Sequence, residues 1–265
     1  MIQISEHTLT NQDILKIVLD QCAEDMGCNS DDFLIKENVL VPFCPSANVR
    51  ECLKEPNVCN FISFGNNIVA AATKDISDIV SEYISRYEFY YCFDTPNIHW
   101  LNEKLIEKGY KVCFMSEYYL PDVNNIPNLS CTYETRILKQ TDFKGLYSSE
   151  WEHALSTDYK KDVLGIGAYD KGRLIGLAAC SADCREIWQM GVDVLPNYRR
   201  SGIGSALTTL LAKEILKCKK VPMYCVAWSN IRSTRNAVKS GFLPTWAEMT
   251  IKPINVVDNI NKETL

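Results

Sequence analysis

One stretch constrains the fold of this chain most: a strand that leads into a loop of arginines and glycines, followed by a long helix. The strand is the run EIWQMGVDVL, and the loop contains RRSGIG at residues 199–204. The helix is SALTTLLAKEILKC, whose apolar residues recur at helical spacing. The glycines permit backbone conformations that other residues avoid. We therefore predict a strand–turn–helix unit whose turn is flexible and positively charged.

The sequence of the second half predicts elements in this order: a strand, a helix, three strands, a helix, a strand, a helix and a strand. Two apolar runs joined by a turn at DKGR indicate that two of the three strands form a hairpin. This order predicts an α+β fold, with a mixed, mostly antiparallel sheet flanked by helices. The predicted elements are CTYETRIL, the helix QTDFKGLYSSEWEHAL, the hairpin DVLGIGAYDKGRLIGLAACSA, EIWQMGVDVL, SALTTLLAKEILKC, PMYCVAW, STRNAVKSG and FLPTWAEMTIKP.

The first half of the chain also alternates between helical and strand-like sequence patterns. A helix follows the N-cap residue Thr10 and ends at Gly27. The later predicted elements are the strands FISF and NIVAAAT, the helix DISDIVSEYISRY, the strand EFYYCF, the helix PNIHWLNEKLIEKG and the strand YKVCFMSEYYL. A Pro- and Asn-rich stretch, PDVNNIPNLS, follows. It predicts two domains, residues 1–130 and 131–265.

The two halves contain a similar segment. Residues 90–110 and 223–242 each have Tyr-Cys, then Asn-Ile, then a helical run that ends in Lys-x-Gly-aromatic. The similarity indicates a duplicated unit, and chance similarity between two strand–helix–strand segments is the alternative.

Composition excludes several classes of protein. A net charge of -5 disfavours a nucleic-acid surface, which is normally basic. No apolar run reaches the roughly 20 residues that cross a bilayer, and the first residues do not resemble a signal peptide. We expect a cytoplasmic, bacterial protein. Its 12 cysteines are expected to be reduced, mostly buried thiols, because disulfide frameworks are typical of short secreted chains. A metal site is not expected, because Cys180 and Cys184 lack the further ligands.

The loop at residues 199–205 has the chemistry of an anion site. A helix that begins at Gly202 leaves its first N–H groups without partners, and Arg199 and Arg200 add positive charge. The sequence thus predicts a bound phosphate or pyrophosphate. The dinucleotide-binding and P-loop motifs do not fit, because a third glycine and a Lys-Ser or Lys-Thr pair are missing. The alternative is a simple turn with solvated arginines.

The region around this loop resembles the GCN5-related N-acetyltransferase (GNAT) superfamily. Its motif, Arg or Gln followed by x-x-Gly-x-Gly or Ala, stands here as RRSGIG after a strand ending VDVLP. The strand PMYCVAW, then Asn230-Ile231-Arg232-Ser233 and Lys239-Ser240-Gly241-Phe242, follow as in that family. The resemblance covers roughly residues 131–252. Both halves together resemble bacterial two-domain members, in which a degenerate N-terminal copy precedes the active one.

The resemblance implies acetyl-CoA as cosubstrate and no metal. Backbone at Val192 and Val194 would pair with the pantetheine arm, and the loop would bind the pyrophosphate. Asn230 and Ser233 match positions beside the cofactor, or else they cap the next helix. The implied binding residues are Val192, Val194, Arg199, Arg200, Ser201, Gly202, Ile203, Gly204, Ser205, Asn230 and Ser233.

The usual catalytic side chains of the family are missing here. Ala237 stands where many members have a Tyr acid, and Trp188 or Met190 stands where they have a Glu. Substitute candidates are Glu186 at the strand start, Glu150 in the predicted helix SSEWEHAL, and Tyr224. Each has a structural alternative. Glu186 would be a solvated carboxylate at the strand end, Glu150 would lie on an ordinary helix surface, and Tyr224 would pack in the core. Trp151 and His153 are candidates to line an acceptor pocket. Asp193 faces away from Val192 and Val194, and is expected either to be structural or to support a neighbouring residue of the site.

Three functions are compatible with this pattern. The first is N-acetyltransferase activity, in which the primary amine of a small molecule, or an amino terminus, attacks the thioester. The second is a non-catalytic, regulatory acyl-CoA-binding module, suggested by the missing Tyr and Glu. The third is transfer from another donor such as aminoacyl-tRNA, which the net charge disfavours. We expect no nucleic-acid or membrane partner, and a homodimer is compatible with the sequence. The acceptor is not indicated.

Overall fold

The computed structural model of the 265-residue chain describes residues 9–44, 46–50, 53 and 57–263. The chain packs into two compact units. Unit 1 contains the described residues up to Ile17 together with Tyr119–Pro244, and unit 2 contains Val18–Tyr118 and the described residues from Thr245 onward. The predicted division near residue 130 stays a prediction.

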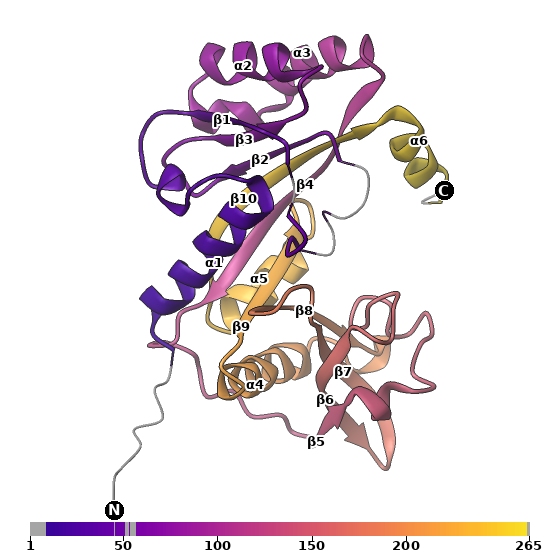
Figure 1. Ribbon diagram of the computed structural model, residues 1–265. Helices are drawn as coiled ribbons and strands as arrows, with labels where there is room; N and C mark the ends of the chain where they lie inside the picture. Colours follow the sequence, from indigo (N-terminus) through magenta and orange to yellow (C-terminus); the bar gives the residue numbers. More distant parts are fainter. Residues whose placement is uncertain (1–8, 45, 51–52, 54–56, 264–265) are drawn as a thin grey trace, which may run out of the picture. The chain divides into compact units, whose positions relative to one another are not determined.

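Unit 1 holds the strand–loop–helix stretch. Its strands follow the order β9-β8-β7-β6-β5, antiparallel except for the parallel pair β8 and β9. Helix α4 packs against β6, β7 and β8 (Figure 1). The elements are β5 (Glu134–Lys139), η4 (Gln140–Phe143), β6 (Asp162–Asp170), β7 (Arg173–Ser181), β8 (Ile187–Val194), η5 (Pro196–Tyr198), α4 (Ile203–Lys217), β9 (Val221–Ala227) and α5 (Ile231–Lys239).

Local chemistry explains two of these elements. The β6–β7 hairpin turns at Lys171 and Gly172, whose φ angles of 48° and 84° are those of a type I′ turn. Helix α4 buries a stripe at four-residue spacing, formed by Ile203, Leu207, Leu211 and Ile215. This stripe fixes the helix on the sheet, and with it the position of the helix N-terminus.

The strands of unit 2 follow the order β1-β3-β2-β10-β4. The β1–β3 pair is parallel, whereas β2 pairs antiparallel with β3 and β10. Helices α2 and α3 lie side by side over this sheet (Figure 1). The elements are α1 (Asn11–Met26, which begins in unit 1), η1 (Ser30–Phe33), β1 (Val39–Pro42), β2 (Cys59–Ser63), β3 (Val69–Ala72), α2 (Ser77–Arg86), η3 (Phe89–Phe93), α3 (Thr95–Ile106), β4 (Tyr110–Pro121), β10 (Phe242–Pro253) and α6 (Ile254–Glu263).

The predicted fold class is confirmed. The chain is α+β, with mixed, mostly antiparallel strand pairing and flanking helices. Within the described residues, no helix has the length and apolar character needed to cross a bilayer. The cysteines that the structure describes are unbridged.

Two predicted elements are wrong, and two were missed. EFYYCF was predicted as a strand, but Phe89–Phe93 is a 3₁₀ helix, so it does not repeat the strand that holds Tyr224. The helix predicted over residues 140–155 is only the short η4, followed by turns. We call residues 144–161, up to the start of β6, the β5–β6 loop. Strand β1 and helix α6 were not predicted.

Candidate functional site

The loop between β8 and α4 is closed by its own hydrogen bonds. The Arg199 Nε donates to the Val194 carbonyl at 2.8 Å, and the Ser201 hydroxyl donates to the Tyr198 carbonyl at 2.6 Å. Arg200 and Gly202 have φ angles of 63° and 85°, in the left-handed region. Glycine suits the second of these positions, because it has no Cβ atom to disfavour a positive φ.

The N-terminus of α4 has no side-chain cap. Gly202 is the N-cap residue, and its carbonyl accepts a hydrogen bond from the Ala206 N–H at 3.0 Å. The amides of Ile203, Gly204 and Ser205 therefore have no partner inside the helix. A Cβ atom built on Gly202 would meet no atom within 4 Å. Together with the helix dipole, this open end favours an anion.

Strand β8 separates from β9 before either strand ends. Their parallel register runs from Ile187 opposite Val221 to Met190 opposite Tyr224, while β8 continues to Val194. On its other side, β8 stays paired with β7 up to Val194. The backbone of residues 191–194 thus has no β9 partner, and an unpaired strand edge is where an extended ligand can pair as a further strand.

The polar residues predicted next to the cofactor form a network at the start of α5. Asn230 is the N-cap of α5 and accepts a hydrogen bond from the Ser233 N–H at 3.2 Å. The Ser233 and Tyr224 hydroxyls are 3.0 Å apart, and Asn236 contacts Tyr224 at 3.4 Å. Burial is the main cause that raises the pKa of Tyr224, which is 3% exposed.

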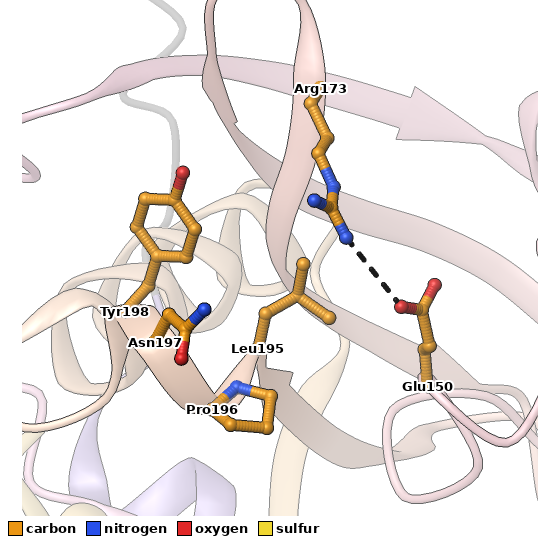
Figure 2. Close-up of a pocket in the computed structure, with 6 residues that line it drawn as sticks. All are labelled: Glu150, Arg173, Leu195, Pro196, Asn197 and Tyr198. Carbon is orange, nitrogen blue, oxygen red and sulfur yellow. Dashed lines mark ion pairs between the residues drawn. The ribbon is translucent and has the colours of Figure 1, made fainter.

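A small pocket of about 190 Å³ lies beside the loop. Figure 2 shows Glu150 from the β5–β6 loop opposite Arg173 from β7, and the stretch Leu195–Tyr198 forms the other wall. The Glu150 and Arg173 side chains are both more than half exposed, with 3.8 Å between Oε1 and Nη2. This is a weak ion pair that a ligand can displace.

The comparison with protein families agrees with this geometry. Residues 132–242 match the model of the Acetyltransferase (GNAT) family. The match covers β5 through α5, and therefore the loop, the uncapped helix and the separated strands. No curated protein is significantly similar to the chain.

Solved GNAT structures resemble parts of the chain. A GCN5-related N-acetyltransferase-like protein from Streptococcus suis has 17% identity and a TM-score of 0.43, covering 57% of this chain and 67% of that one. A tandem GNAT protein from the clavulanic acid biosynthesis pathway has 12% identity and a TM-score of 0.39, covering 53% and 52%. YncA, a putative acetyltransferase from Salmonella typhimurium with its cofactor acetyl-CoA, has 16% identity and a TM-score of 0.34, covering 46% and 92%. The chain thus spans about half the length of the tandem protein.

The remaining loop residues of the GNAT motif fall into two groups. Ser201 and Arg200 are exposed, whereas Ile203 and Ser205 are buried. The Ser205 hydroxyl donates to the Asn236 Oδ1 at 3.0 Å, so only the backbone of Ser205 faces the open helix end. A Cβ atom on Gly204 would lie 3.4 Å from the same Asn236 oxygen, which leaves little room for a larger residue.

The structure separates the three candidate catalytic residues. Glu186 pairs with Lys220 at 3.1 Å and with Arg185 at 3.2 Å, at the end of β8 that is opposite the loop. Eight residues of strand, about 26 Å, separate it from Val194. Glu150 lies in the pocket of Figure 2, and Tyr224 is in the core beside Ser233. Ala237, at the position of the usual Tyr, is fully buried.

Sequence reasoning missed the main partner of Asp193. Its Oδ2 accepts hydrogen bonds from the backbone N–H groups of His153 and Ala154, at 2.8 and 2.9 Å. The expected structural role of Asp193 is thus to hold the β5–β6 loop on β8. The alternation of side chains along β8 indicated on which face of the strand Asp193 lies. Nothing in the sequence indicated that its partner would be 40 residues away. Among the described residues, no cluster of three or more His, Cys, Asp or Glu side chains could hold a metal.

Proposed function

We propose that the chain transfers an acetyl group from acetyl-CoA to the primary amine of a small molecule. One observation carries the proposal: an uncapped helix N-terminus follows, across one short loop, a strand whose pairing with its neighbour has stopped. The family match over residues 132–242 supports the same activity.

The cosubstrate fits the loop in two ways. Its pyrophosphate would accept hydrogen bonds from the amides of Ile203, Gly204 and Ser205, with the guanidinium groups of Arg199 and Arg200 adding charge. Its pantetheine arm would pair with the backbone at Val192 and Val194, where β8 has no β9 partner. Side chains matter little in either contact, which explains why glycine and exposed backbone dominate the site.

The reaction needs a proton acceptor. An alkylammonium group has a pKa near 10, so it must lose a proton before its nitrogen attacks the thioester carbon. A C–N bond then forms, the C–S bond breaks, and the thiol of coenzyme A leaves. A backbone N–H of the unpaired part of β8 would stabilise the developing oxyanion.

The acceptor would enter beside the β5–β6 loop. The pocket between Glu150 and Arg173 places a carboxylate where an ammonium group can be bound (Figure 2). A pocket of about 190 Å³ suits a small molecule better than a protein segment. We therefore propose a small amine as acceptor, in a protein that works without a nucleic-acid partner.

A second function is a non-catalytic acyl-CoA-binding module. It is favoured by Ala237, which is buried and lacks any acid–base group at the position where many relatives have Tyr. Such a module would bind acetyl-CoA as tightly as the enzyme would, but no amine would increase the release of coenzyme A.

Calorimetric titration with acetyl-CoA tests the site. Gly202→Asp should abolish binding, because the new carboxylate competes for the same N–H groups. The matched control is Gly109→Asp, since Gly109 has the same φ of +85° and equally open surroundings. Equal affinity of the two variants would refute the assignment.

Turnover is tested with a panel of primary amines. Coenzyme A should be measured by chromatography, because the 12 cysteines of the chain would react with thiol reagents. If acetyl-CoA binds and no amine accelerates its conversion to coenzyme A, the proposed N-acetyltransferase activity is wrong. The result would instead support the non-catalytic binding module.

A further inference from the structure

The β5–β6 loop touches β8 at the point where β8 leaves β9. A Cβ atom built on Gly191 would lie 2.0 Å from the His153 carbonyl oxygen and 3.1 Å from the Ala154 Cα. Only glycine lets the loop backbone come this close. Gly191 is the first β8 residue beyond the last β9 pair, Met190 and Tyr224. His153 therefore lies against the strand segment that would bind the thioester end of the cosubstrate.

Asp193 fixes this loop and also faces the imidazole of His153. While its Oδ2 accepts the two backbone N–H groups, its Oδ1 lies 3.4 Å from the His153 Nδ1. The Asp193 side chain is 12% exposed, whereas that of His153 is 71% exposed. The Asp193 carboxylate is thus held in place, and the His153 ring can contact it with one nitrogen while the rest of the ring stays in solvent.

The second carboxylate near the ring is Glu152. Its Oε1 lies 3.8 Å from the same Nδ1, and its side chain is 63% exposed. Glu152 and Asp193 are the charged groups that face His153 within 4 Å among the described residues. Only Asp193 is anchored by backbone hydrogen bonds, so it is the one that can orient the ring.

We propose that His153 is the general base of the acetyl transfer and that Asp193 is its positioning residue. The inference rests on the proposed function and supplies the acid–base group that the family pattern leaves open. The Nδ1–H of His153 would donate to Asp193, which leaves the Nε2 lone pair directed away from the carboxylate. A base oriented by a third group is a recurring arrangement in enzymes that transfer acyl groups.

The proton balance of the step is complete. The Nε2 of His153 takes one proton from the acceptor ammonium, and the neutral amine attacks the thioester carbon. The C–N bond forms, the C–S bond breaks, and its electron pair moves to sulfur. The thiolate takes the second proton of the attacking nitrogen and leaves as the thiol, while His153 returns its proton to water. Acetyl-CoA and the amine are the only reactants.

The first experiment is independent of activity. Long-range ¹H–¹⁵N spectra report the tautomer of each imidazole, and the chain has only 3 histidines, so His153→Gln assigns the signal. We expect the Nδ1–H tautomer for His153 in the wild type. Asp193→Asn should shift the signal toward the Nε2–H tautomer, because its amide oxygen can still hold the loop while its NH₂ group can only donate to Nδ1. An unchanged tautomer would refute the Asp–His geometry whatever the enzyme does.

The second experiment uses the amine that supports the fastest turnover in the panel. His153→Gln should lower kcat/KM by about 10²- to 10⁴-fold, the usual contribution of a general base. Asp193→Asn should lower it on the order of 10²-fold, as misplacement of a reacting group by ~1 Å does. Glu152→Gln is the matched control and should stay within about twofold, like other surface changes.

The pH dependence separates a base from a residue that only supports the loop. In the wild type, the rise of log kcat/KM with pH should level off once the base has lost its proton. In His153→Gln the rise should continue toward the titration of the free amine, near pH 10. Acetyl-CoA affinity should not change in either variant. An unaltered pH profile with normal rates would overturn the proposal; if no amine is acetylated at all, the proposed function fails and this inference fails with it.

Discussion

The contact between Gly191 and the β5–β6 loop gives the sharpest prediction about the fold of the site. In Gly191→Ala the new Cβ would lie 2.0 Å from the His153 carbonyl oxygen, whereas ordinary contacts begin at 3.4 Å. The atom it meets belongs to the backbone, so no side chain can rotate out of the way. The loop or the strand must therefore move by about 1.4 Å.

The size of the effect depends on whether the loop stays bound to Asp193. If loop and strand shift together, overpacking costs about 1–3 kcal/mol. If the loop detaches, the bonds from the His153 and Ala154 amides to the carboxylate are also lost, at about 1.5–3 kcal/mol each. Both cases predict a lower midpoint of urea unfolding. Only detachment predicts faster hydrogen exchange of these two amides.

A second glycine in the same sheet is the control. In Gly167→Ala the Cβ would lie 2.8 Å from the Leu174 Cδ1 and 2.9 Å from the Tyr169 Cε2, which are ends of side chains that can move. This variant should be the more stable of the two. If Gly191→Ala has the same unfolding midpoint and the same exchange rates as Gly167→Ala, the close approach of the loop to β8 is wrong.

Three further predictions test other parts of the chain. Arg50→Met should destabilise unit 2 by about 3–5 kcal/mol in urea unfolding, because it leaves the buried carboxylates of Asp25 and Glu248 without their partner. Burial raises the pKa of Asp162 above its ordinary value, so the folded state binds this proton more tightly than the unfolded state; raising the pH through that window should cost stability in the wild type, and the cost should disappear in Asp162→Asn. Iodoacetamide at pH 8.5 should label the exposed Cys218 before Cys28, whose pKa burial raises to about 12, as peptide mass spectrometry would show.

The strand–loop–helix stretch could be predicted because its signals are local. The apolar residues of β8, the four-residue spacing in α4 and the glycines between them all lie within one segment of the chain. Each element therefore forms as its own residues prefer, and the anion site follows from the point where strand and helix meet.

The β5–β6 loop could not be predicted because distant carboxylates decide its structure. The N–H groups of His153 and Ala154 bond to Asp193, and the N–H of Ser156 bonds to Asp162 at 3.1 Å. A helix over residues 140–155 would have used the His153 and Ala154 amides for its own hydrogen bonds. The helical spacing of the apolar residues was real, but tertiary contacts outweighed it.

The segment EFYYCF shows a different limit. Its aromatic residues favour a strand, yet the Tyr91 N–H bonds to the Glu88 carbonyl and the Asp94 N–H to the Tyr91 carbonyl, which are 3₁₀ contacts. Cys92 and Phe93 are buried while Tyr90 is exposed, a burial pattern that a short aromatic run does not reveal.

Strand β8 links the anion site and the proposed base through its two faces. Val194 points toward α4, since its Cγ2 would lie 3.7 Å from a Cβ atom on Gly204, at the helix end that would bind the pyrophosphate. Gly191 and Asp193 point the other way, toward His153. Because side chains alternate along a strand, a shift of β8 by one residue would misplace both groups at once. The same short segment would therefore position both the proposed cosubstrate and the proposed base, and no helix in the β5–β6 loop is needed to bring His153 there.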